Sequence, residues 1–387
     1  MKIKVDKALF IKSWSLAEKS AGASSSVNVF SAIRMNAGDE NVELQATDIK
    51  TSIICRAHGV TVEEPGEVVI PLKGVTDLFK KIGSNEFTLQ ITDGKAVLKA
   101  GKNRYTFTTF PVSDFPKLPT SKSARLFCVI KAADLLVALD RGSLCASMAD
   151  EYPQYLSSPL LEVENGTMNV VSTDNRRLAL AKTAVEQSEE PTSLLLPIKG
   201  LKELEKILAM LDAEAEIKVL YDEAQAYFST EGMEYAVRRV ESKFPNYTRI
   251  IPQGHTSQVD VDRAELLSSI ERVDVVVRDY VRTVMMKLTD GNCRLTGRAP
   301  EFGEAVENIA CDLTGDPLLI GFNTRFFIDA VKVLDSEKVT LLFNGPDGHM
   351  EVRGKDSDQF LCLIAPLELS SEELESFDQA NDGGDAI

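Results

Sequence analysis

The chain has 387 residues, 44% of them hydrophobic and 26% charged, which suits a protein of two or three globular domains. No apolar run approaches the roughly 20 residues of a membrane span, and the start MKIKVDKALF lacks the apolar core of a secretory signal, so we expect a cytoplasmic protein. The formal net charge of −16 argues by itself against nucleic acid as a partner, because phosphate contact depends on Lys and Arg.

The first third of the chain alternates predicted helices and strands. A helical pattern over Asp6–Ala21 follows a short opening strand, and a second one ends the stretch EVVIPLKGVTDLFKKI (Glu67–Ile82), where proline and glycine precede the helix. Alternating apolar residues in VLKAGKNRYTFTTF (Val97–Phe110) indicate two antiparallel strands joined by a tight turn. The segment TFPVSDFPKLP (Thr109–Pro119) follows, and we interpret it as the strand that closes this part of the chain.

The middle third has the same order of patterns. A helix is predicted over Lys131–Ser143, and SLLLPIKGLKELEKIL (Ser193–Leu208) again places proline and glycine before a helical pattern. Antiparallel strands are indicated over Ala226–Val240. A second Phe-Pro segment, KFPNYTRIIP (Lys243–Pro252), follows and is interpreted as the closing strand of the middle third.

The last third repeats the pattern less clearly. Helices are predicted over Asp262–Val273 and at the end of PLLIGFNTRFFIDAVKVL (Pro317–Leu334). The final stretch, residues 370–387, is acidic and poor in apolar residues, so we expect a disordered tail.

These similarities have a constant spacing. Pro71 and Pro197 are 126 residues apart, as are Thr47 in LQATDIKTSIICRA and Thr173 in VVSTDNRRLALAKT. In the fainter third copy we match Gly321 with Pro197 of the second copy, which gives an offset of 124 residues. We therefore predict an α+β fold of three repeated domains, each with two helices packed on antiparallel sheet, over residues 1–122, 123–253 and 254–369, followed by the tail 370–387.

Basic residues recur on the second helix of the repeat. Lys199, Lys202 and Lys206 fall on one helical face, and Lys73 and Lys80, with Lys81 beside them, occupy the same repeat positions 126 residues earlier. In the third copy Arg325 and Lys332 are seven residues apart, but the offset of 124 places them outside the equivalent positions. A solvated helix face is the alternative interpretation of such a pattern.

The combination of the Pro-Leu-Lys-Gly helix start, the segment TDNRRLA (Thr173–Ala179), FPNYTRIIP and the closing LIAPL (Leu363–Leu367) resembles the bacterial sliding clamps, the β subunits of DNA polymerase III. The resemblance extends from Met1 to about Leu369. It implies a DNA-clamp fold in which two chains join head to tail as a homodimeric ring around duplex DNA, with the basic residues named above facing the DNA without reading its sequence.

The resemblance also implies a pocket for short peptides, with Gln followed by apolar and aromatic residues, on DNA polymerase subunits, the clamp loader and repair proteins. By motif match it would comprise Tyr155, Leu156, Thr173, Asn175, Arg176, Arg177, Leu178, Pro245, Arg249, Ile250, Phe326, Leu363, Ala365, Pro366 and Leu367. We expect the apolar members to supply buried area and Thr173, Arg177 and Arg249 to supply hydrogen-bond donors. Core packing is the alternative for the apolar members.

The sequence departs from the family pattern at this predicted pocket. Asn175-Arg176 stands where the family often has Gly-His, and Ala365 and Leu367 stand where it has Met, which adapts to many partners. The family often has a basic residue near the position of Glu368. We hypothesise that Glu368 and the acidic tail repel acidic peptides or cover the pocket until a partner displaces them.

Two other classes of function compete with a sliding clamp. An enzyme would need a nucleophile and a base at a recognised spacing or a glycine-rich phosphate loop, and the sequence has neither, so we expect no catalysis. The family resemblance implies a non-catalytic processivity factor that associates with the nucleoid when loaded. The six scattered cysteines and three histidines have no metal-ligand spacing, so we expect no disulfides, metal site or cofactor. A clamp-shaped interaction scaffold that is seldom loaded on DNA is the second rival, and the retained lysine face argues against it.

Overall fold

The computed structural model describes residues 1–22, 28–39, 41–188 and 191–369. The predicted tail at 370–387 lies outside the described residues. The described part forms two compact units: unit 1 is Met1–Leu139, Leu160–Met168 and Thr183–Glu241, and unit 2 is Asp140–Pro159, Asn169–Lys182 and the chain from Ser242 onward. The middle third of the sequence thus contributes to both units. None of the described helices is long and apolar enough to cross a membrane.

The described residues form six α-helices, each where the sequence predicts a helix. Asp6, Asp262 and Asn323 each accept a hydrogen bond from a backbone N–H of the first turn that follows, which satisfies donors that a helix start leaves unpaired. The helices are α1 (Lys7–Ala17), α2 (Val75–Lys81), α3 (Ala132–Gly142), α4 (Ile198–Leu208), α5 (Arg263–Val277) and α6 (Thr324–Lys332).

Unit 1 is built on antiparallel sheets. One sheet has the order β5-β1-β7-β8-β9 and another the order β14-β10-β16-β17-β18-β4-β3-β2-β6, so strands from the first and middle thirds share one sheet. The junction is the pairing of β18 with β4, in register from Met233↔Cys55 to Val237↔Thr51. The strands of this unit are β1 (Lys2–Asp6), β2 (Ala32–Ala37), β3 (Val42–Thr47), β4 (Thr51–Arg56), β5 (Val60–Glu64), β6 (Gly66–Pro71), β7 (Glu86–Thr92), β8 (Lys95–Ala100), β9 (Asn103–Thr108), β10 (Arg125–Lys131), β11 (Leu160–Glu164), β14 (Gln187–Ser188), β15 (Thr192–Leu195), β16 (Glu216–Tyr221), β17 (Gln225–Thr230) and β18 (Met233–Arg238).

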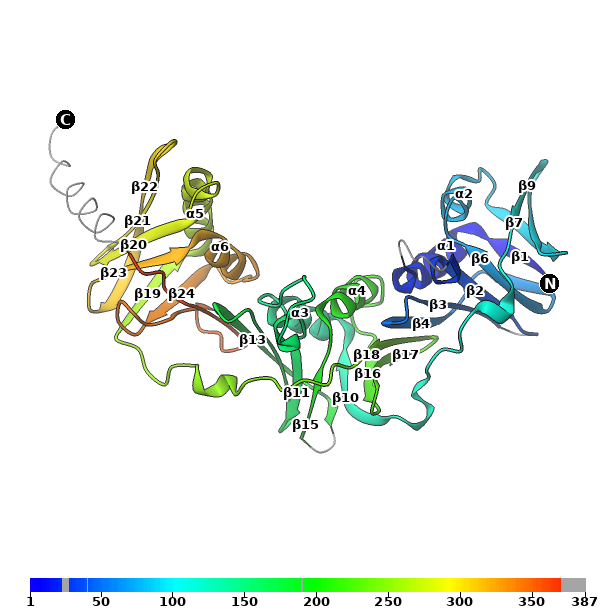
Figure 1. Ribbon diagram of the computed structural model, residues 1–387, viewed down its shortest axis with the longest axis horizontal. Helices are drawn as coiled ribbons and strands as arrows, with labels where there is room; N and C mark the ends of the chain where they lie inside the picture. The colour runs from blue at the N-terminus through cyan, green and yellow to red at the C-terminus, as the bar shows by residue number, and fades with distance from the viewer. Residues whose placement is uncertain (23–27, 40, 189–190, 370–387) are drawn as a thin grey trace. The chain divides into compact units, whose positions relative to one another are not determined.

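Unit 2 contains most of an extended sheet, with the order β12-β13-β26-β25-β24-β19-β22-β21-β20-β23 in this part. Here a strand of the middle third again pairs with a strand of the following third: β13 pairs with β26 from Arg177↔Ile364 to Ala181↔Phe360. Helices α5 and α6 pack against each other beside this sheet (Figure 1). The strands are β12 (Thr167–Thr173) and β13 (Arg177–Ala184), which both cross the boundary between the units, and β19 (Ser257–Asp262), β20 (Thr283–Thr289), β21 (Asn292–Ala299), β22 (Gly303–Gly315), β23 (Leu318–Asn323), β24 (Lys338–Phe343), β25 (Met350–Gly354) and β26 (Phe360–Ile364).

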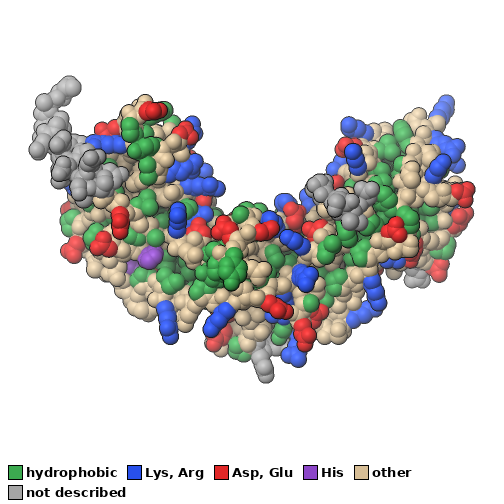
Figure 2. Space-filling view, in the orientation of Figure 1, with side chains coloured by type: hydrophobic (Ala, Val, Ile, Leu, Met, Phe, Trp, Pro, Cys, Tyr) green, Lys and Arg blue, Asp and Glu red, His purple; other side chains and the backbone are tan. Residues whose placement is uncertain are grey.

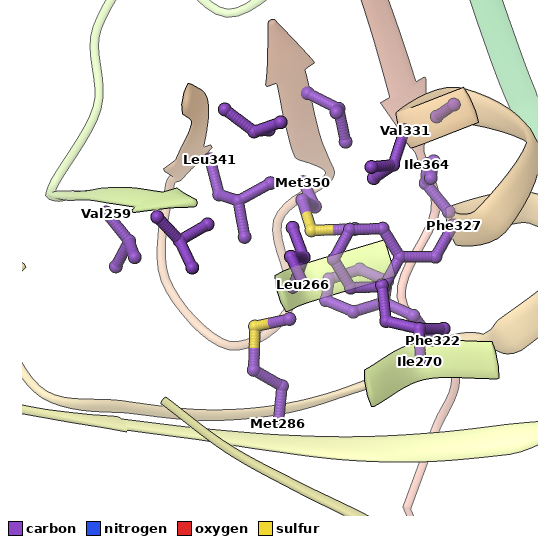
Figure 3. Close-up of a cluster of buried hydrophobic side chains, with 14 of the residues drawn as sticks. Val259, Leu266, Ile270, Met286, Phe322, Phe327, Val331, Leu341, Met350 and Ile364 are labelled. Carbon is purple, nitrogen blue, oxygen red and sulfur yellow. The ribbon is translucent and has the colours of Figure 1, made fainter. Parts of the chain in front are cut away.

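Each unit has a buried apolar core beneath its helices. In unit 1 the rings of Phe10, Trp14, Phe79 and Phe87 pack with centroids 4.9–6.0 Å apart, mostly edge to face, which is the favoured geometry for aromatic pairs. In unit 2 the α5 residues Leu266 and Ile270 and the α6 residue Phe327 interdigitate with strand residues (Figure 3). Burial of these side chains holds the helices to the sheets.

The prediction that the two Phe-Pro segments are closing strands is wrong. After β9 ends at Thr108, the chain makes only a single bridge at Phe110 and then a short 3-10 turn, Val112–Asp114. After β18 ends at Arg238, the chain is irregular as far as a 3-10 turn at Tyr247–Arg249. Proline has no N–H to donate to a ladder, so these segments are extended connections outside the sheets.

The third repeat is in register with the second in its second helix, contrary to the offset of 124 inferred from the sequence. Helices α4 and α6 begin at Ile198 and Thr324, which are 126 residues apart (324 − 198). Arg325 and Lys332 therefore occupy the positions equivalent to Lys199 and Lys206 (325 − 199 and 332 − 206 are both 126). The misleading landmark was Gly321, which lies inside β23 and is not the residue that begins the helix.

Candidate functional site

The tight turn between β12 and β13 fixes the centre of the predicted pocket in unit 2. Thr173 Oγ1 donates to the carbonyl oxygen of Arg177 at 2.8 Å and accepts from Asn175 N at 3.1 Å. Asp174 Oδ1 accepts from the backbone N–H groups of Arg176 and Arg177, each at 3.0 Å. Asn175 has φ 67°, a left-handed conformation that asparagine tolerates better than most residues. The turn is therefore held by its own side chains before any partner is present.

Arg177 joins this turn to helix α6. Its Nε donates to Asp174 Oδ2 at 3.0 Å, its Nη1 donates to Asp329 Oδ2 at 2.9 Å, and its guanidinium carbon lies 4.3 Å from the centroid of the Phe326 ring. Burial opposes the charge of this guanidinium, but the hydrogen bonds to Asp329 and Asp174 hold the pKa of Arg177 above its ordinary value. A paired, stacked guanidinium is a rigid plane, so Arg177 and Phe326 form one wall of fixed shape.

A second wall is aromatic. The rings of Tyr155 and Phe244 meet edge to face at 5.8 Å, and Phe244 continues to Tyr247 at 6.4 Å. The hydroxyl of Tyr155 donates to Asn175 Oδ1 at 3.3 Å, which ties this wall to the turn. Pro245, which follows Phe244 in the connection between middle and last thirds, is half-buried.

The strand β26 and the residues after it complete the surface. Ala365 N donates to the carbonyl oxygen of Arg176 at 2.9 Å, and Leu367 N donates to the carbonyl oxygen of Gly321 at 2.8 Å. Ala365, Pro366 and Leu367 are all half-buried, so each leaves apolar area accessible on one side. The chain from Ile364 to Leu367 therefore spans from the turn to the edge strand β23.

The predicted pocket residues fall into three groups in unit 2. Thr173, Leu156, Leu178 and Leu363 are buried, so they support the surface from beneath. The half-buried group is Tyr155, Arg177, Pro245, Phe326, Ala365, Pro366 and Leu367, and the exposed group is Asn175, Arg176, Arg249 and Ile250. The contacts described above join the turn, Tyr155, Phe326 and the β26 end into one surface. Ile250 is connected to the aromatic wall through its backbone, whose N–H donates to the carbonyl oxygen of Tyr247 at 3.0 Å.

The expectation that Thr173 supplies a hydrogen-bond donor to a partner is wrong, because its hydroxyl hydrogen is used within the turn. Three residues that matter were missed from the sequence: Asp174 and Asp329, which fix Arg177, and Phe244, which supports Tyr155. The repeated Phe-Pro dipeptide in the sequence could have pointed to Phe244. Asp329 had none, because its partner lies 152 residues away along the chain.

The predicted DNA-facing residues lie on or just before the second helices. We call Lys73, Lys199 and Arg325, together with Lys80, Lys206 and Lys332, the six repeat cations, because they occupy two equivalent positions in the three copies. All six are exposed, and Lys and Arg side chains gather over α5 and α6 in unit 2 (Figure 2). Lys81 is also exposed, whereas Lys202 is half-buried with both Glu205 oxygens within 2.9 Å of its Nζ. Lys73 precedes α2, because Gly74, at φ 78°, delays the helix start to Val75.

The cysteines lie in the interior of the described part of the chain. All six cysteines are free and buried, and burial raises the pKa of Cys55, Cys128 and Cys293 to about 12 each. Glu43 adds to the rise at Cys55 and Cys311 adds to it at Cys293. Thiols in that state are poor nucleophiles at neutral pH. Within the described ranges, no group of three His, Cys, Asp or Glu side chains is placed to hold a metal ion.

Repeated α+β domains, basic positions in register on their second helices and one arginine–aromatic surface define a clamp-type protein. Three family models match consecutive parts of the chain: the N-terminal domain of the DNA polymerase III beta subunit over residues 1–119, its central domain over 132–246 and its C-terminal domain over 248–368. The chain belongs to the DNA polymerase III beta subunit family and has its three-domain clamp fold.

Individual relatives agree with this assignment. The chain is 27% identical to the beta sliding clamp of Pseudomonas putida over 332 residues, covering 85% of this chain and 89% of the relative. It is 26% identical to that of Halalkalibacterium halodurans over 377 residues, covering 94% and 98%. Among solved structures, the DNA polymerase III beta subunit of Thermotoga maritima superposes with a TM-score of 0.89 at 25% identity, covering 95% and 100%. A Pseudomonas aeruginosa sliding clamp bound to griselimycin gives the same values.

Proposed function

We propose that this chain is a non-catalytic processivity factor: a DNA sliding clamp that closes as a ring around duplex DNA in the cytoplasm and tethers polymerase, clamp loader and repair proteins. The observation that carries the proposal is the register of the six repeat cations. In each of the three copies a cation stands at both equivalent positions, on or just before the second helix, although the whole protein has a net charge of −16. If Lys and Arg were placed at random on a protein with this excess of acidic residues, a cation would not be expected at both positions in all three copies.

Contacts of these cations with DNA would be to phosphates, which carry no base sequence. They would be weak and strongly salt-dependent, because each neutralised phosphate contributes about −0.9 to the slope of log K against log salt. Weak contacts permit sliding, so residence on DNA has to come from the closed ring. The acidic remainder of the surface disfavours binding of DNA elsewhere.

Two unpaired strand edges support a head-to-tail homodimer. Strand β9 ends the five-stranded sheet of unit 1, and residues 303–310 of β22 pair with β21 on one side with no strand on the other among the described residues. The first edge carries Arg104, with Lys99 opposite it on β8, whereas the second carries Glu304 and Glu307. Pairing of β9 with β22 of a second copy would cover both edges, and two such contacts close a ring.

We further propose that the surface formed by Tyr155, Arg177, Phe326, Ala365 and Leu367 docks short peptides with Gln followed by apolar and aromatic residues. Its half-buried apolar groups offer area for an anchor side chain, and the fixed plane of Arg177 preorganises the wall. Arg249 and Ile250 remain candidate rim residues.

The test is retention on DNA. The protein is loaded with a clamp loader and ATP onto nicked circular plasmid, washed in high salt, and the plasmid is then linearised. Survival of the wash on circles and loss on cutting would show a topological link. Equal loss from circles and linear DNA, with a loader shown to be active on its own clamp and to bind this protein, would contradict the ring and leave the interaction scaffold.

A further inference from the structure

Each of the three helix-end lysines among the six repeat cations is paired with a carboxylate. Lys80 Nζ lies 4.0 Å from Glu18 Oε2, Lys206 Nζ lies 2.7 Å from Glu203 Oε1, and Lys332 Nζ lies 2.7 Å from Glu271 Oε1. The lysine side chains are 49%, 55% and 53% exposed, so they remain accessible to a ligand. We call Glu18, Glu203 and Glu271 the guard glutamates.

The guard glutamates come from three different places. Glu18 lies in the 3-10 turn after α1, Glu203 lies on the same helix as its lysine, and Glu271 lies on α5. Copies of one ancestral pair would occupy equivalent positions, and these three do not. The repeated feature is thus that each helix-end lysine has a carboxylate partner, although the three glutamates occupy non-equivalent positions.

We propose that the guard glutamates set the strength of DNA contact. The inference rests on the proposed function, since it assumes that the six repeat cations face the duplex. A phosphate that approaches Lys80, Lys206 or Lys332 has to compete with the carboxylate and is repelled by it. Exposed pairs of this kind hold only weakly, so the lysine can exchange between its carboxylate and a passing phosphate. The result is a contact strong enough to guide the duplex and weak enough to slide along it.

A purely structural role is the alternative. A lysine in the last turn of a helix interacts favourably with the helix dipole, and a nearby glutamate adds a modest ion pair. In that case removal of the carboxylate would slightly lower stability and would leave DNA affinity unchanged. The two roles therefore differ in a measurable quantity.

The experiment uses the full chain and measures the affinity for a fluorescent 30-base-pair duplex by anisotropy at several salt concentrations. The variant Glu18→Gln/Glu203→Gln/Glu271→Gln keeps the size of each side chain and removes three negative charges. We expect affinity about tenfold higher at low salt, and a steeper dependence on salt because more phosphates are neutralised.

A matched control exists within the chain. Glu63, Glu86 and Glu214 form exposed pairs of 2.7, 2.9 and 2.8 Å with Lys2, Lys4 and Lys131, and none of these residues lies on a second helix. The variant Glu63→Gln/Glu86→Gln/Glu214→Gln changes net charge by the same amount and should leave affinity within about twofold of the wild type. An equal rise in both variants would assign the effect to net charge and overturn the inference.

A third variant separates failure of the inference from failure of the proposed function. Replacing Lys80, Lys206 and Lys332 with glutamine should weaken binding. If this weakening is seen while the guard variant binds like the wild type, the guard role is wrong and the DNA contact stands. If the lysine variant binds DNA as the wild type does, the proposed DNA-facing surface and the inference built on it both fall.

Discussion

The turns Thr47–Thr51 and Thr173–Arg177 share one backbone and differ in what surrounds it. In both, the threonine hydroxyl donates to the carbonyl oxygen four residues on, at 2.7 and 2.8 Å, and the aspartate accepts from the same two backbone N–H groups. In both, the carbonyl oxygen of the fourth turn residue accepts a hydrogen bond of 2.9 Å from a backbone N–H in or just after the neighbouring strand. Arg238 N donates to Lys50, and Ala365 N donates to Arg176. The repeat has thus preserved a complete hydrogen-bonded scaffold.

The difference lies on the second helix that packs beside each turn. At the first turn, α4 carries Gly200, where an added Cβ would lie 2.8 Å from Val237 Cγ1, so the helix packs directly on the sheet. At the second turn, α6 carries Phe326 at the equivalent position (326 − 200 is 126), stacked against Arg177. Gly200 lets α4 pack closely on the sheet beside the first turn, whereas the Phe326 ring of α6 forms a wall beside the second turn. The proposed docking of peptides therefore depends on a few side chains placed on a shared backbone.

The largest effect is expected from moving the aromatic residue to the helix beside the first turn. Gly200→Phe should lower the free energy of unfolding by at least about 3 kcal/mol, because the ring has no space between α4, Val237 and Thr51. Urea midpoints measure this change. Gly254→Phe is the control, since a Cβ there meets nothing within 4 Å. Equal midpoints for the two variants would mean that the close packing of α4 on the sheet does not depend on Gly200.

A smaller effect is expected from removing the arginine wall. Arg177→Ala should weaken binding of a fluorescent peptide with Gln, Leu and Phe by at least about tenfold, because the Phe326 ring loses its stacking partner and Asp174 and Asp329 lose their cation. Anisotropy titration measures the affinity. Thr51→Ala, at the equivalent position of the first turn, should leave peptide affinity unchanged. Undiminished binding by the Arg177 variant would place the docking surface elsewhere.

The two aspartates should have similar effects on stability and different effects on binding. Asp48→Ala and Asp174→Ala each remove the acceptor for two backbone N–H groups, at a cost of about 1 kcal/mol in unfolding free energy. Only Asp174→Ala should also weaken binding of the peptide, because it removes one of the two carboxylates that hold Arg177 in place. Asparagine variants, which keep one acceptor oxygen, serve as controls. A loss of peptide affinity in Asp48→Ala would contradict the distinction between the turns.

The smallest effect concerns the third residue of each turn. Ile49 has φ 78° and is 62% exposed, whereas its counterpart Asn175 has φ 67°. A β-branched residue is strained in the left-handed region, so Ile49→Asn should raise the free energy of unfolding by about 1 kcal/mol. The reverse change, Asn175→Ile, should lower it by at least as much, since it also loses the bond from Tyr155. Denaturant unfolding of both variants decides this, and a destabilised Ile49→Asn would show that Ile49 makes contacts that outweigh the strain.

Local chemistry made much of the fold predictable. Periodicity and capping residues located all six helices, and alternation located hairpins such as β8 with β9 and β17 with β18. The repeats at 126 residues were visible because both turns need the same threonine and aspartate. The closing strands failed as a prediction, because the same Phe-Pro dipeptides that mark the repeat also remove the N–H that a strand requires.

For the candidate site, the sequence by itself determined which residues were available: the turn Thr173–Arg177, the aromatic connection at Phe244-Pro245 and the basic positions of the second helices. Tertiary structure alone decided their roles. It paired Arg177 with Asp329 across 152 residues and placed Leu178 and Leu363 beneath the surface. It also put α6 in register with α4 and gave each helix-end lysine a carboxylate partner. These outcomes depend on which strands pair and which helices pack together, and long-range pairing leaves no pattern in the local sequence.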